Sequence, residues 1–258
     1  MVQKQKLIVT TSDGVALNVV KYVPEQSKGK IFMLHWLSVP KEGPSNILLD
    51  TALWLVNAWF KVITFDFRGH WGSGGESPDI TVETGLLDID AVFRSEEKDD
   101  LPFWIFGFSY GGMISIEYTV KNALSPHVMV FFSPALDFVD GVFKNEHSVM
   151  WNLYLDAERD GSLDRDGYFT LPYNWFRVGK KVFQSAKHYK PYEDLKTIVT
   201  KSLIIQWKND QMLSYEYMKM LWEPIVDKYI TLDTVHGLIE EKEKAIQETV
   251  SWFSSYVK

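Results

Sequence analysis

Ser109 lies in a segment whose composition suits a catalytic nucleophile. It stands in Gly107-Phe108-Ser109-Tyr110-Gly111, after an apolar run of strand length and before a helical pattern. A serine at such a strand–turn–helix junction has a strained backbone, so the residues two before and two after it must be small. The turn presents the hydroxyl at the edge of a sheet, and the Tyr110 backbone N–H points to where an oxyanion would form. Alone, the pattern also fits an ordinary glycine-rich turn.

A serine hydroxyl becomes a good nucleophile only when a base takes its proton and a carboxylate orients that base. Two residues that directly follow predicted strands qualify: Asp210 comes after the strand at 202–206, and His236 comes after the strand at 228–232. Their order along the chain, Ser109, Asp210 and His236, is one in which this catalytic triad occurs. The spacing therefore predicts Ser109 as nucleophile, His236 as base and Asp210 as its orienting acid.

Other residues are weaker candidates for these roles. Asp233 lies close to His236 in the sequence and is the alternative acid. His147 and His188 fall outside the regular strand–helix pattern, and His127 precedes a strand, so each is a poor candidate for the base. We expect the two remaining histidines, His35 and His70, to hold their loops by hydrogen bonds.

The elements that must position these residues alternate between buried strands and amphipathic helices, which is typical of a parallel α/β sheet covered on both faces. The alternation stops between Pro134 and about Thr200, where aromatic residues and acidic, glycine-rich turns dominate. We interpret residues 135–199 as a cap inserted into a core formed by residues 1–134 and 200–258, within a single domain. Inside this cap, Arg165-Asp166-Gly167 followed by Tyr168-Phe169-Thr170 predicts a hairpin turn.

A tetrahedral intermediate needs two hydrogen-bond donors for its oxyanion. The Tyr110 N–H supplies one, and the Leu37 N–H, in the loop after the predicted strand at 30–35, is our choice for the second. Ten Trp, twelve Tyr and sixteen Phe are many for a core of this size, so some should line a substrate cavity. Our candidates are Trp36, Trp151, Trp175 and Phe176, although aromatic residues in a cap can equally form its own core.

Composition excludes several other classes of protein. The 258 residues contain no cysteine, so disulfides and thiolate metal sites are ruled out, and no paired histidine and carboxylate spacing indicates a metal. The net charge of −7 argues against nucleic acid as a partner. The chain has neither an apolar run long enough to insert into a membrane nor a signal-peptide pattern at Met1–Lys6. We expect a cytoplasmic protein, although a mature secreted chain would look the same. The sequence is also compatible with a homodimer.

The chain resembles the α/β-hydrolase superfamily, and within it the esterase, monoglyceride-lipase and cinnamoyl-esterase-like group often labelled serine aminopeptidase S33. The matching residues are Phe65-Asp66-Phe67-Arg68-Gly69-His70 with Gly72 and Ser73, Gly107 to Gly112, Asp210 and His236. The resemblance implies an eight-stranded, mostly parallel sheet with an insert after the sixth strand that forms a lid over an acyl pocket. One departure is Trp36, which stands where the family usually has glycine. Another is Trp71, an extra residue in the loop after His70.

The residues and the resemblance together predict a serine hydrolase that cleaves carboxylic esters of acyl or aryl-acyl substrates, with no cofactor. Thioester cleavage, acyl transfer and aminopeptidase activity use the same catalytic groups, so they remain alternatives. A different class of function is a non-catalytic hydrolase fold that binds a small molecule. Trp36, in the loop of the second oxyanion donor, is the feature that favours this class.

Overall fold

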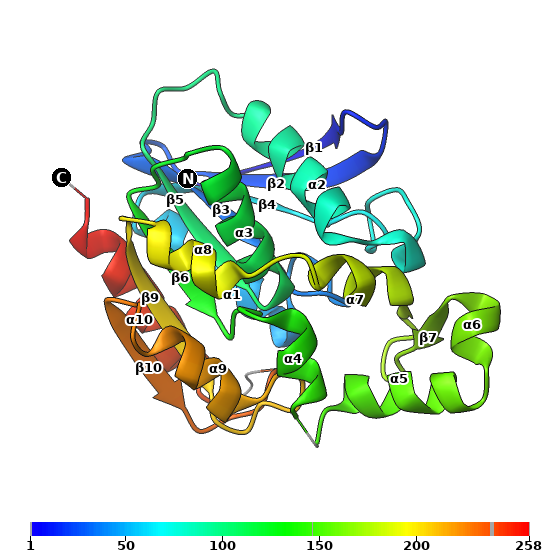
Figure 1. Ribbon diagram of the computed structural model, residues 1–258. Coiled ribbons are helices and arrows are strands. Elements are labelled where there is room, and N and C mark those ends of the chain that lie inside the picture. Colours follow the sequence, from blue (N-terminus) through cyan, green and yellow to red (C-terminus); the bar gives the residue numbers. More distant parts are fainter. Residues whose placement is uncertain (1, 146, 238–239, 258) are drawn as a thin grey trace.

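A mixed, mostly parallel sheet forms the centre of the molecule in the computed structural model, which describes residues 2–145, 147–237 and 240–257. Eight strands lie in the order β1-β2-β4-β3-β5-β6-β9-β10 (Figure 1). The β1–β2 and β2–β4 pairs are antiparallel and the remaining pairs are parallel. This is the predicted α/β-hydrolase architecture. The strands are β1 (Gln3–Thr10), β2 (Ala16–Val23), β3 (Gly29–Leu34), β4 (Phe60–Phe65), β5 (Phe103–Phe108), β6 (Val128–Phe132), β9 (Lys201–Trp207) and β10 (Lys228–Leu232).

Helices cover both faces of the sheet, and each face has its own hydrophobic core. On one face α1 (Ile47–Asn57) packs against β2 and β4, and α10 (Lys242–Ser255) packs against β6 and β9. On the other face lie α2 (Val82–Arg94) and α3 (Tyr110–Lys121). Burial on both faces explains why the central strands are continuous apolar runs. The carboxyl ends of these parallel strands meet at one edge of the sheet, and their loops carry the candidate catalytic residues.

Local capping explains where α2 begins, whereas α1 begins without a side-chain cap. Thr81 caps α2: its Oγ1 accepts from the Thr84 N–H at 3.1 Å, and Thr84 Oγ1 accepts from the Thr81 N–H at 2.9 Å. Ser45 precedes α1 without capping it. It belongs to a 3₁₀ turn, Pro44–Asn46, with a positive φ of 47°, and Asn46 precedes α1 in a left-handed conformation. A second 3₁₀ turn, Ser77–Asp79, precedes α2.

Between β6 and β9 the chain leaves the sheet and forms what we call the cap segment, residues 138–197. In Figure 1 most of it extends to the right of the sheet. Its elements are α4 (Phe138–Phe143), α5 (Val149–Arg159), α6 (Ser162–Asp166), β7 (Tyr168–Thr170), β8 (Arg177–Gly179), α7 (Lys180–Ala186) and α8 (Pro191–Thr197). The last helix of the core before β10 is α9 (Tyr215–Trp222).

The hairpin turn predicted at residues 165–170 is wrong. β7 pairs antiparallel with β8, so the turn of this hairpin lies at residues 171–176. The residues before β7 form the short helix α6, which Gly167 ends in a left-handed conformation with φ of 80°. A glycine that ends a helix and a glycine in a hairpin turn need the same positive φ, so the sequence pattern could not separate them.

Candidate active site

Ser109 occupies the sharp turn between β5 and α3. Its backbone has φ of 50° and ψ of −113°, and its side chain is nearly buried. The flanking glycines are required by close packing: a Cβ on Gly111 would lie 2.5 Å from the Leu34 carbonyl oxygen, and one on Gly107 would lie 2.6 Å from the Gly112 Cα. Tyr110 is the first residue of α3, where backbone N–H groups have no partner within the helix.

Asp210 and His236 form a buried pair in the loops after β9 and β10. His236 Nδ1 lies 2.7 Å from Asp210 Oδ2. The other carboxylate oxygen, Oδ1, accepts from the backbone N–H groups of Met212 at 2.8 Å and Leu213 at 2.9 Å. With Asp210 ionised, His236 Nδ1 carries the proton that it donates, which leaves Nε2 as the acceptor. Asp233, the alternative acid, is exposed and accepts instead from the Asn209 side chain.

Ser109 and His236 line the same small cavity, which we call the inner chamber. Its volume is about 20 Å³, and apart from these two residues its walls are apolar. The walls come from the loop after β3, from α4 and α5 of the cap segment, and from the loop after Asp210: Trp36, Leu37, Phe138, Val142, Met150, Met212 and Leu213. Leu37, the predicted second oxyanion donor, therefore lies at the same cavity as the nucleophile.

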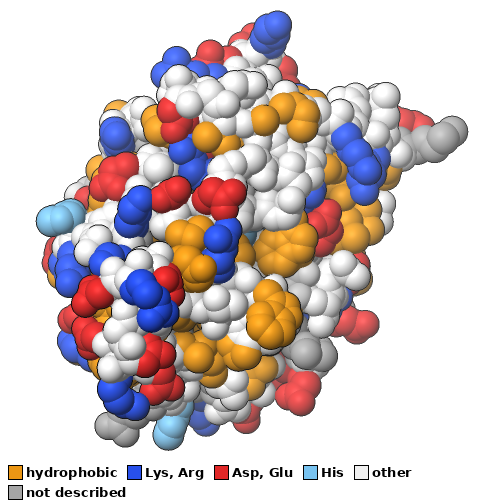
Figure 2. Space-filling model, turned by 90° about the vertical axis from the view of Figure 1, so that its right-hand side faces the viewer, with side chains coloured by type: hydrophobic (Ala, Val, Ile, Leu, Met, Phe, Trp, Pro, Cys, Tyr) orange, Lys and Arg blue, Asp and Glu red, His pale blue; other side chains and the backbone are white. Residues whose placement is uncertain are grey.

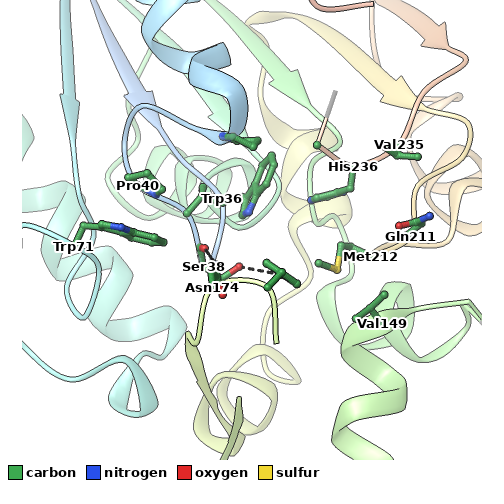
Figure 3. Close-up of a pocket in the computed structure, with 14 residues that line it drawn as sticks. Trp36, Ser38, Pro40, Trp71, Val149, Asn174, Gln211, Met212, Val235 and His236 are labelled. Carbon is green, nitrogen blue, oxygen red and sulfur yellow. Dashed lines mark hydrogen bonds between the residues drawn. The ribbon is translucent and has the colours of Figure 1, made fainter. Parts of the chain in front are cut away.

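A larger cavity of about 410 Å³, which we call the outer chamber, opens on the other side of His236. Trp36, Met212 and His236 line both chambers, and Figure 3 shows Trp36 and Met212 beside the His236 ring. The remaining walls are Ser38, Val39, Pro40, Pro44, Trp71, Val149, Tyr173, Asn174, Gln211, Val235 and Gly237. The surface on the α5–α7 side of the molecule carries exposed hydrophobic side chains among charged ones (Figure 2).

The predicted substrate-binding aromatic residues divide into two groups. Trp36 lines both chambers, and its ring centroid lies 4.9 Å from that of His236 and 4.3 Å from that of Phe108. Trp151, Trp175 and Phe176 line neither chamber. Trp151 packs against other aromatic residues of the cap segment, and Phe176 packs on His70. Trp175 is 80% exposed. Two of these rings therefore serve packing, the alternative that the sequence left open.

Sequence reasoning missed most of the chamber walls. Met212 and Leu213 lie within three residues of Asp210, so their closeness to a candidate catalytic residue was a usable signal. Val149 and Met150 had no such signal. They reach the site only because α5 of the cap segment begins against the loop after β9, where the Val149 N–H donates to the Gln211 carbonyl.

His35 and His70 hold the loop that carries Leu37, as expected. His35 Nε2 accepts from the Phe67 N–H at 2.9 Å, so its Nδ1 donates to the Trp36 carbonyl at 2.7 Å. In a trans peptide the C=O and N–H groups point in opposite directions, so this bond also fixes the direction of the Leu37 N–H. His70 Nε2 accepts from the Ser38 N–H at 3.1 Å. Burial lowers the pKa of both imidazoles to about 3, so both are neutral.

The lowered pKa of His35 predicts a specific pH dependence for His35→Asn. Below its ordinary pKa of 6.5, imidazole takes up a proton in the unfolded chain but not in the folded one until about pH 3, so parent stability falls over this window. Asparagine does not titrate. The loss of unfolding free energy caused by His35→Asn should therefore shrink by about 2 kcal/mol between pH 7 and pH 5. Urea unfolding at both pH values measures it.

Exposed His188 supplies the control for this measurement, because solvent reaches its ring in both states. The change with pH in His35→Asn is therefore compared with the change in His188→Asn. A His35→Asn difference that changes no more with pH than that of His188→Asn would contradict a neutral, buried His35.

Within the described residues, no group of three or more histidine, cysteine, aspartate or glutamate side chains could hold a metal ion. No helix there is long and apolar enough to span a membrane. The groups that the described residues place at this site are a hydroxyl, a buried imidazole–carboxylate pair and backbone N–H donors.

Comparisons with known proteins agree with this geometry at the level of the family and the fold. A family model described as "Alpha/beta hydrolase family" matches residues 35–240. A Synechocystis protein named as a "putative esterase" is 29% identical over 114 residues, which are 42% of this chain and 31% of that protein. An abhydrolase domain-containing protein of Dictyostelium discoideum is 29% identical over 43% of this chain and 12% of its own length. The chain thus spans less than a third of the curated relatives it matches.

Solved structures match over nearly the whole chain. Est1E of Butyrivibrio proteoclasticus with bound ferulic acid superimposes with a TM-score of 0.79 at 15% identity, covering 97% of this chain and 99% of that one. The monoacylglycerol lipase of Paleococcus ferrophilus gives a TM-score of 0.70 at 20% identity, covering 93% and 99%. At these identities the likeness concerns the fold.

Proposed function

Because the chain belongs to the alpha/beta hydrolase family, we propose that it is a serine hydrolase that cleaves carboxylic esters through an acyl-enzyme. The observation that carries the proposal is the buried His236–Asp210 pair, whose imidazole lines the same inner chamber as Ser109. A buried pair of this kind beside a strained serine is costly to maintain, and strain of this sort clusters at functional sites.

The mechanism follows from the positions of these groups. Ser109 Oγ attacks the ester carbonyl carbon as its proton passes to His236 Nε2, and Asp210 stabilises the imidazolium through Nδ1. The backbone N–H groups of Tyr110 and Leu37 bind the oxyanion of the tetrahedral intermediate. The C–O bond to the alcohol then breaks, and the alcohol oxygen takes the proton from His236. A water molecule, deprotonated by His236, attacks the acyl-enzyme, and the acid leaves as Ser109 regains its proton.

Esters are favoured over the amide substrates of an aminopeptidase by the lining of the site. The described residues around both chambers include no aspartate or glutamate that could pair with the α-ammonium group of an aminopeptidase substrate. The names of the Synechocystis relative and of the structural neighbours point to ester substrates as well. We further propose that residues 135–199 act as the cap of the site, because α4 and α5 supply walls of the inner chamber. Thioester cleavage and acyl transfer use the same groups.

A fluorophosphonate probe tests the proposal directly, since it phosphonylates only a serine that a neighbouring base activates. The parent should be labelled at a single site, identified as Ser109 by peptide mass spectrometry, and Ser109→Ala should not be labelled. An unlabelled parent, or a variant labelled as well as the parent, would favour a non-catalytic binding protein.

A further inference from the structure

The division of the site into two chambers has a direct bearing on the substrate, provided that the proposed ester chemistry holds. Ser109 lines only the inner chamber, whereas His236 lines both. Trp36 and Met212 complete the shared wall, so the two cavities meet at the imidazole that transfers the proton.

The chemistry of the two half-reactions assigns a part of the ester to each chamber. The acyl group becomes bonded to Ser109 Oγ, with its carbonyl oxygen at Tyr110 and Leu37, and so must lie in the inner chamber. The leaving alcohol takes its proton from His236 and must depart past that ring. The outer chamber borders His236 but not Ser109, so the alcohol is assigned to it.

The volume of each chamber then limits the size of the acyl group or the alcohol that it can hold. The inner chamber, of about 20 Å³, holds roughly one water-sized group, which corresponds to a methyl group. Its walls are large buried side chains, among them Phe138, Met150 and Leu213, which yield only at an energetic cost. The outer chamber is about twenty times larger, at about 410 Å³, and mainly apolar, with the polar groups of Asn174 and Gln211 at its walls.

We infer that the protein is selective for short acyl groups, acetyl above all, esterified to a bulky and largely apolar alcohol or phenol. Selectivity for the acyl part is set by the inner chamber and selectivity for the alcohol by the outer one. The structural neighbour with bound ferulic acid accommodates a much larger aromatic acid. The inner chamber of this chain has no room for such an acid beside Ser109.

Two adjacent residues at the start of α5 offer a matched test. Met150 lines only the inner chamber and Val149 only the outer one. We measure kcat/KM for p-nitrophenyl acetate, butyrate and hexanoate, which vary the acyl group alone, and for ethyl, phenyl and 1-naphthyl acetate, which vary the alcohol alone.

The parent should prefer acetate to butyrate by at least about tenfold and discriminate more strongly against hexanoate. Met150→Ala should change the butyrate-to-acetate ratio at least about tenfold in favour of butyrate. Val149→Ala should leave this ratio within about twofold and change the relative rates of the three acetates instead. If Met150→Ala does not fold, Val142→Ala on α4, which also lines only the inner chamber, replaces it.

The outcomes separate this inference from the proposed function. A parent that is labelled at Ser109 but prefers hexanoate or methyl ferulate to acetate overturns the acyl assignment and leaves the ester chemistry intact. Equal effects of Met150→Ala and Val149→Ala on the acyl ratio also overturn it. A parent that hydrolyses no ester and is not labelled overturns the proposed function itself.

Discussion

Replacing Ser109 with alanine should lower kcat on p-nitrophenyl acetate by about 10⁴-fold to 10⁶-fold. The substitution removes the one hydroxyl among the described residues that line the inner chamber, and it leaves the His236–Asp210 pair without a nucleophile to activate. Alanine fits the space that the serine leaves, so the variant should fold. Thermal unfolding checks the fold, and steady-state kinetics at saturating substrate measure the loss.

Ser115 supplies the matched control, since it is a buried serine on the same helix, α3, whose hydroxyl donates only to the Gly112 carbonyl. Ser115→Ala should keep kcat within about threefold of the parent, because this hydroxyl takes no part in the reaction. Comparable losses in the two variants would mean that the helix, rather than the Ser109 hydroxyl, carries the effect.

Replacing Asp210 with asparagine should lower kcat by about 10³-fold to 10⁴-fold while the fold is kept. The backbone N–H groups of Met212 and Leu213 both donate to one oxygen of Asp210, so the asparagine must place its own oxygen there. Its NH₂ group then faces His236 Nδ1 and forces that nitrogen to accept. The ring proton moves to Nε2, which can no longer take the proton of Ser109.

Asp233→Asn is the control for this prediction, because Asp233 is exposed and bonds to Asn209. Its kcat should stay within about threefold of the parent, since its carboxylate does not touch His236. A larger loss in Asp233→Asn than in Asp210→Asn would reverse the assignment of the acid. Comparison of kcat at one pH, with matched unfolding curves for both variants, is sufficient.

The sheet could be predicted from the sequence because its central strands are buried on both faces. Segments such as residues 103–106 and 128–132 are therefore continuous apolar runs, and the apolar residues of the helices between strands recur at helical spacing. The same regularity located Asp210 and His236, because residues just after parallel strands converge at one edge of the sheet. The structure brings this pair together at 2.7 Å.

The chambers could not be predicted, because their walls depend on how the cap segment packs. Nothing in the sequence around Met150 distinguishes a residue facing the nucleophile from one in the core of the cap segment. Phe176 shows the reverse case: an aromatic residue in the expected region packs on His70 and lines neither chamber. Side-chain direction at a helix start or in a tight loop depends on contacts with distant segments, which local pattern does not encode.

Neighbouring residues face opposite chambers at three places: Leu37 and Ser38, Val149 and Met150, and Gln211 and Leu213 on either side of Met212. A single substitution in one of these segments could thus change the specificity for the acyl part or for the alcohol part of the substrate. The chamber that binds the other part would keep its walls. Deleting one residue from any of these segments would instead shift the following residues, so the walls of both chambers would change together. Among natural variants of this chain, we therefore expect substitutions in these segments to be tolerated far more often than changes of length.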